Sequence, residues 1–211
     1  MIFDFLKKNK SIWWLIGYFK LEEWWLNSFS EQERNNILET FQPLWWDWKD
    51  MLIWTKITST NDNELRFLWT LSNWFLNNKW KELSYKIIEK AEDYINKPYI
   101  SILDKHFFYL EKLKVYYRNR DIDDFALDKA ISACVEQINI SKLSKEAFLK
   151  EYKNSPLPSH SWFEQLAIIE EKRWNYKKAI ELSKQAFEEW WNWDWEKRIE
   201  RNEKKLQKSK D

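Results

Sequence analysis

The chain has 211 residues but only one glycine and one cysteine, and it has no long apolar run. A single cysteine cannot form an internal disulfide, so Cys134 favours a reducing, cytoplasmic compartment. A membrane-spanning helix needs about 20 consecutive apolar residues, and no stretch of the chain comes close to this length. Lys and Arg number 35 against 34 Asp and Glu, a net charge of +1 that attracts neither nucleic acid nor an anionic membrane. We therefore expect a cytoplasmic protein that does not bind membranes and for which nucleic acid is an improbable partner.

The residues that usually carry catalysis are also scarce. His106 and His160 are the only histidines, and neither has a histidine four residues away or a cysteine pair, so no zinc site is predicted. We expect His106 to be a packed structural residue rather than a pH-sensitive contact, and His160 to lie in the first turn of a helix. Cys134 lies on an apolar helix face, where cysteine behaves as a small hydrophobe. The sequence predicts no catalytic residue, no metal and no cofactor, and thus a protein that is not an enzyme.

Tryptophan is as abundant as glycine is rare, with 17 tryptophans in the chain. Average usage, about 7%, would place roughly 15 glycines in a chain of this length. Several tryptophans also occupy turn contexts in which glycine is usual. These are Trp174, Trp191, Trp193 and the group Trp45, Trp46 and Trp48. Some bacteria read the UGA codon as glycine, and a translation that assigns UGA to tryptophan would produce this pattern. The alternative is a tryptophan-rich chain whose surface aromatics form a binding face.

The clearest structural pattern lies in Ser159–Phe187. Apolar and small residues recur at spacings of three and four in two sets, with Arg173–Tyr176 between them. The sets are Phe163, Leu166, Ala167 and Glu170, then Ala179, Ile180, Ser183, Ala186 and Phe187. Each set lies on one face of a helix, so the stretch predicts two antiparallel helices joined by a tight turn.

This hairpin resembles the tetratricopeptide repeat (TPR), which places large and small residues at fixed positions on two helices around a glycine-containing turn. The matching residues here are Phe163, Leu166, Ala167, Tyr176, Ala179, Ile180 and Ala186, and Trp174 stands at the turn glycine. The resemblance implies an all-α, TPR-like α-solenoid that binds a peptide or protein on its concave face.

Similar patterns predict helices in most of the remaining chain. A capping box at Ser30–Glu33 starts a helix that ends near Pro43, and alternating charges indicate a C-terminal capping helix. The expected helices are one or two in residues 1–29, then 30–42, 64–77, 81–96, 102–118, 124–138, 144–152 and 194–210. We expect a helical N-terminal region at residues 1–60 and a hairpin array at residues 61–211.

The expected partner-binding surface is a stripe on the first helix of each hairpin, offset from the core face. Its polar residues can hold a peptide by its carbonyls or its terminal carboxylate. They are Arg66, Asn73, Asn77, Lys112, Asn119, Gln165 and Lys172. In the helix expected at residues 102–118 the stripe also includes Phe108 and Val115. The sequence thus predicts a non-catalytic protein-interaction scaffold. The alternative is an enzyme or a nucleic-acid-processing accessory protein with a site in the first 60 residues.

Overall fold

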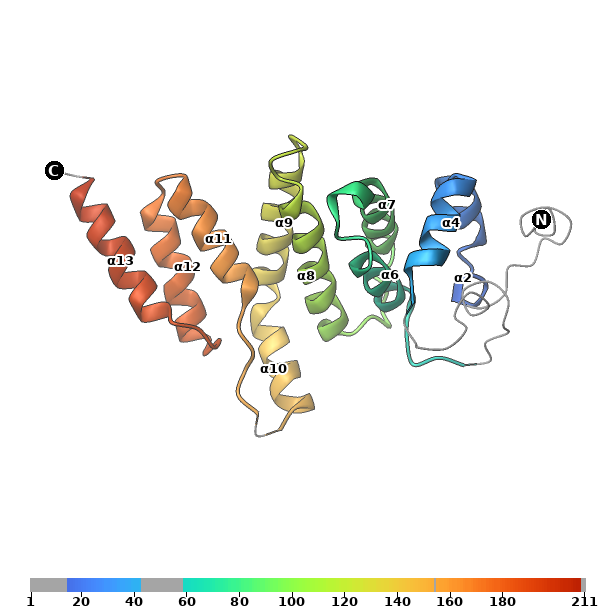
Figure 1. Ribbon diagram of the computed structural model, residues 1–211. Coiled ribbons are helices and arrows are strands. Elements are labelled where there is room, and N and C mark those ends of the chain that lie inside the picture. Colours follow the sequence, from blue (N-terminus) through green and yellow to red (C-terminus); the bar gives the residue numbers. More distant parts are fainter. Residues whose placement is uncertain (1–14, 43–58, 154, 210–211) are drawn as a thin grey trace, which may run out of the picture. The chain divides into compact units, whose positions relative to one another are not determined.

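The computed structural model describes residues 15–42, 59–153 and 155–209, and every regular element in these ranges is a helix. The predicted all-α class is therefore confirmed (Figure 1). The chain divides into an N-terminal unit, Met1–Ile100, and a C-terminal unit, Ser101–Asp211. Residues 64–92 group with the residues before them, although the sequence suggested a boundary between residues 60 and 61. No helix in the described ranges is long and apolar enough to cross a membrane.

The N-terminal unit consists of short helices joined by aromatic and ionic contacts. Its elements are α2 (Leu15–Tyr18), α3 (Glu22–Ser28), α4 (Glu31–Thr40), α6 (Glu64–Asn73), the 3-10 turn η1 (Asn78–Trp80) and α7 (Lys81–Glu92). The predicted capping box starts α4, with the Glu33 amide donating to Ser30 Oγ and the Ser30 amide donating to Glu33. Lys86 of α7 then donates to the same Glu33 carboxylate at 2.7 Å, which connects α4 to the hairpin of α6 and α7.

The hairpin of α6 and α7 buries the residues that the sequence pattern placed in its core. They are Leu68, Leu71, Ser72 and Phe75 from the first half, and Ser84, Ile88, Ala91 and Ile95 from the second. Both helices are shorter than predicted, because α6 ends at Asn73 and α7 at Glu92 and the residues that follow form turns.

The C-terminal unit contains two longer hairpins, an inserted helix and a final helix (Figure 1). Its elements are α8 (Ile102–Arg118), α9 (Ala126–Asn139), α10 (Ser141–Glu151), α11 (Ser161–Lys172), α12 (Tyr176–Glu188) and α13 (Trp195–Lys208). α8 pairs with α9 and α11 with α12. In addition, α11 packs on α9 and α8, while α13 packs on α12. The hairpins therefore share one core within this unit.

The hairpin of α11 and α12 packs small residues against large ones, as predicted. Ala167, Ala179 and Ala186 are fully buried, as is Phe163. Phe187 differs from the prediction, because half of its surface is exposed. It belongs to the last turn of α12, next to the buried Ala186.

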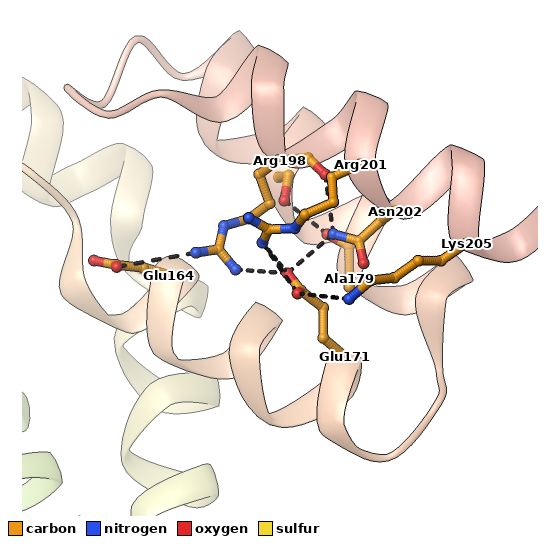
Figure 2. A network of polar contacts seen from close by, with 8 residues as sticks. Glu164, Glu171, Ala179, Arg198, Arg201, Asn202 and Lys205 are labelled. Carbon is orange, nitrogen blue, oxygen red and sulfur yellow. Dashed lines mark hydrogen bonds and ion pairs between the residues drawn. The ribbon is translucent and has the colours of Figure 1, made fainter.

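The final helix, α13, packs on the second hairpin through polar side chains (Figure 2). Glu171 of α11 accepts hydrogen bonds from Arg198 at 2.6 Å, Asn202 at 2.9 Å and Arg201 at 3.0 Å. Burial raises the pKa of the Glu171 carboxyl, but the Asn202 hydrogen bond and the nearby Arg198 and Arg201 outweigh it and lower the pKa overall. Of the apolar residues Trp195, Ile199 and Leu206 on this helix, only Trp195 is buried. Arg198 and Asn202 are its other buried residues.

Candidate binding pocket

A pocket of about 430 Å³ lies on the C-terminal unit between α8, α10 and the start of α11. The segment that joins α10 to α11 forms one of its walls. The lining residues are His106, Phe107, Leu110, Phe148, Tyr152, Ser155, Pro156, Leu157, Pro158, Ser159, Ser161 and Trp162. Aromatic, aliphatic and proline side chains dominate this set, and it contains no Lys, Arg, Asp or Glu. The pocket is therefore suited to an uncharged, apolar group.

His106 forms part of the pocket lining and is neutral at physiological pH. Burial lowers its pKa to about 3, because the charged imidazolium would lose its hydration. The Gln137 amide nitrogen lies 2.6 Å from His106 Nδ1 and can donate to it, which leaves the ring proton on Nε2. The predicted role of His106 as a packed structural residue agrees with this geometry.

His160 lies next to His106, with the ring centroids 5.8 Å apart. It is the N-cap of α11, and its Nδ1 accepts from the Phe163 amide at 3.4 Å. Burial lowers the pKa of His160 well below its usual value, and His106 lowers it further. With both pKa values lowered, neither ring carries the extra proton that a general acid would donate near neutral pH.

Aromatic rings enclose the two histidines. Trp162 lies 4.6 Å from His106, and Trp191 lies 4.4 Å from His160, both between ring centroids. The indole Nε1 of Trp162 is buried and has no acceptor among the described residues.

The remaining candidates for chemistry are inert in the part of the chain that the structure describes. Burial raises the pKa of the Cys134 thiol to about 12, so the nucleophilic thiolate is negligible at neutral pH. No group of three or more His, Cys, Asp or Glu residues that could hold a metal ion is found in these ranges. Half of the first 60 residues, where the alternative site is predicted, lie outside the described residues, at positions 1–14 and 43–58, and that site stays a prediction.

The stripe expected on α8 is buried. Phe108, Lys112, Val115 and Asn119 are at most 5% exposed, and Asn119 donates to the Val115 carbonyl at 2.8 Å. The prediction that these four residues of α8 are exposed to a partner is therefore wrong. The reason is tertiary, because α8 contacts α9, α10 and α11, whereas a helix in an isolated hairpin has a single neighbour.

The other predicted binding residues are at least partly exposed. Asn73, Asn77 and Lys172 are exposed, while Arg66 and Gln165 are half-buried. Arg66, Asn73 and Asn77 belong to the N-terminal unit, and Gln165 and Lys172 to α11 of the C-terminal unit. The prediction that they bind a partner stays a prediction.

The pocket itself was not predicted. Two signals pointed toward it: the run His106–Phe108 and the pair of prolines Pro156 and Pro158. Neither could reveal that residues about 50 positions apart in the sequence meet around one pocket.

No protein-family model matches the chain, and comparisons with curated proteins and with solved structures find no significant match either. The TPR resemblance therefore rests on the residues of α11 and α12 alone.

Proposed function

We propose that this chain is a non-catalytic protein-interaction module built as a TPR-like stack of α-hairpins, and that its pocket receives a bulky apolar side chain of a peptide or protein partner. The observation that carries the proposal is the uncharged and mainly apolar lining of the pocket on α8, α10 and α11. Burial of an apolar side chain contributes about 1.5–3 kcal/mol, which makes such a pocket a suitable anchor point for a partner.

The TPR-like arrangement is supported by the packing of the C-terminal unit. Small residues of α11 and α12 nest against large ones, and each added helix packs on the preceding hairpin. Lys172, which is exposed, and Gln165, which is half-buried, are on the same helix as Trp162, so they could contact the backbone of a partner that is anchored in the pocket. A cytoplasmic location and a protein partner rather than a nucleic acid are part of the same proposal.

A second apolar hollow lies on the other side of Pro156 and Leu157, and it is a weaker candidate. It is lined by Phe187, Trp190, Trp191, Asn192, Trp193 and Trp195 besides those two residues. Trp193 in this lining is one of the tryptophans whose sequence context is typical of glycine. The partner surface that we propose therefore excludes this hollow.

The proposal is tested by pull-down from a lysate of the source organism with the full chain and three variants. Tyr152→Lys and Leu110→Lys each place a charge at the pocket, on side chains that are half-buried or exposed. Ile122→Lys makes the same chemical change at a 51% exposed position in the turn after α8, away from the pocket.

We expect a protein that co-purifies with the wild type and with Ile122→Lys, but not with the two pocket variants. Circular dichroism of all variants establishes that the fold is retained. A partner that is retained by both pocket variants would refute the proposed site. A small molecule that is converted by the wild type would refute the non-catalytic assignment.

A further inference from the structure

Two helices of the C-terminal unit end in the same hydrogen-bonded motif. After α11, the Trp174 amide donates to the Glu171 carbonyl at 3.2 Å, and the Asn175 amide donates to the Glu170 carbonyl at 2.9 Å. This pair of bonds defines a Schellman motif with Trp174 at the position after the C-cap.

The end of α12 repeats this arrangement. The Trp190 amide donates to the Phe187 carbonyl at 3.0 Å, and the Trp191 amide donates to the Ala186 carbonyl at 3.1 Å. The sequence suggested Trp191 and Trp193 as the glycine-like residues here. The structure shows that the chain reverses at Trp190, one residue earlier.

Both reversals require a left-handed backbone. The φ angle is 62° at Trp174 and 67° at Trp190, and Lys20 at 55° is the other non-glycine residue with positive φ in the described ranges. In this region the Cβ atom approaches the neighbouring carbonyl oxygen, an unfavourable contact that glycine avoids. Lys20 shows that a residue with a Cβ can occupy such a position, so φ alone does not identify a glycine.

The side chains provide the second observation. Trp174 is 79% exposed and Trp190 is 78% exposed, the two highest values among the large hydrophobic side chains described. Trp174 has a ring contact with Tyr176, with centroids 6.2 Å apart, and Trp190 lines the shallow hollow described above. Neither side chain contributes to the buried core.

Other tryptophans are clearly integrated into the core. Trp162 and Trp195 are 1% exposed, and Trp191 is 2% exposed. The indole of Trp195 donates to the Trp191 carbonyl at 2.8 Å, and the indole of Trp191 donates to Glu189 at 3.0 Å. Replacing any of these three by glycine would leave a large cavity, which the core does not tolerate.

We infer that residues 174 and 190 are glycine in the protein as its source organism makes it, whereas residues 162, 191 and 195 are tryptophan. The first two would be encoded by UGA and the other three by UGG. The inference is independent of the proposed function. The inference still bears on the proposed function. Glycine at position 190 removes the most exposed aromatic side chain from the second hollow, and it leaves the pocket at His106 and Trp162 unchanged.

The direct test is mass spectrometry of the protein purified from its source organism. Tryptic fragments 154–172, 174–177 and 185–197 contain all five positions, and fragment ions assign the residue at each. We expect the glycine mass at positions 174 and 190 and the tryptophan mass at positions 162, 191 and 195. Tryptophan at 174 or 190, or glycine at any of the other three, would overturn the inference.

The physical argument has its own test in the recombinant full chain with the sequence as printed. Trp190→Gly removes the unfavourable Cβ contact and should raise the midpoint of thermal unfolding by about 2–4 °C. Lys20→Gly measures the rise in the unfolding midpoint at Lys20, the third residue with a left-handed backbone. Trp193→Gly is the matched control, because Trp193 is 47% exposed and does not have a positive φ. A gain at position 193 equal to that at 190, or no gain at 190, would overturn the argument.

Discussion

Acid should destabilise this protein through His106, a neutral histidine buried beside a second one. The side chain is 3% exposed, and its ring contacts Phe148, Trp162 and His160. The folded state holds its pKa at about 3, whereas the imidazole of an unfolded chain has a pKa near 6.5. Below pH 6.5 the unfolded chain therefore takes up a proton that the folded chain does not.

The sign and the size of the effect follow from this difference. The stabilisation due to neutral His106 is complete above pH 6.5 and is lost progressively as the pH falls toward 3. At pH 4.5, two units below the unfolded pKa, His106 alone lowers the free energy of unfolding by about 2–3 kcal/mol relative to pH 7 and above. The pKa of His160 is lowered as well, so His160 acts in the same direction.

The assay is urea-induced unfolding of the wild type and of His106→Asn at pH 7 and pH 4.5. Asparagine has no charge in this pH range and keeps an acceptor for the Gln137 amide, although the loss of the ring should reduce stability at both pH values. The informative quantity is the change in unfolding free energy between the two pH values. Carboxylates titrate similarly in both proteins, so the comparison isolates His106. We expect the wild type to lose about 2–3 kcal/mol more than the variant.

Equal losses in the two proteins would refute the reasoning. They would mean that His106 is protonated in the folded state or that its ring is hydrated, and the pocket would then not be the apolar site on which the proposed function depends.

Three further changes test separate parts of the structure. Glu171→Gln should reduce the unfolding free energy by about 1.5–3 kcal/mol in urea titrations, because Arg198 loses its closer carboxylate partner and keeps Glu164 at 4.0 Å. Glu188→Gln on the exposed face of α12 should have little effect, and equal effects of the two substitutions would contradict the role of the Glu171–Arg198 contact. Ser30→Ala removes the capping box of α4 and should cost about 1 kcal/mol by the same measurement, whereas an unchanged stability would show that the cap contributes little. Cys134 should resist alkylation by iodoacetamide at pH 8 until the protein is unfolded, and rapid labelling of the folded chain would contradict its burial.

Local features of this protein could be predicted from its sequence because they depend on residues close together in the chain. The Ser30 cap needs only Glu33 three positions later, and the hairpin of α11 and α12 follows from the spacing of Ala167, Ala179 and their neighbours. The left-handed turn at Trp174 was likewise indicated by its place between two helical patterns.

The faces that helices present to the remainder of the protein depend on how many neighbours each one has. On α8, the spacing of Leu110, Leu113 and Tyr117 puts them on one face, yet of these only Leu113 is buried. The three neighbouring helices instead bury Phe108, Lys112 and Asn119 on another face. A spacing pattern shows which residues share a face, but it does not show how many faces are covered.

The candidate site likewise combines features that follow from the sequence with features that depend on tertiary packing. The sequence by itself determined an all-helical chain with hairpins, small-residue contacts and no catalytic cluster that could be recognised. Only the tertiary structure placed His106 of α8 against Trp162 of α11 and Glu171 against Arg198, because these pairs are brought together by packing between helices and not by the periodicity of any one helix.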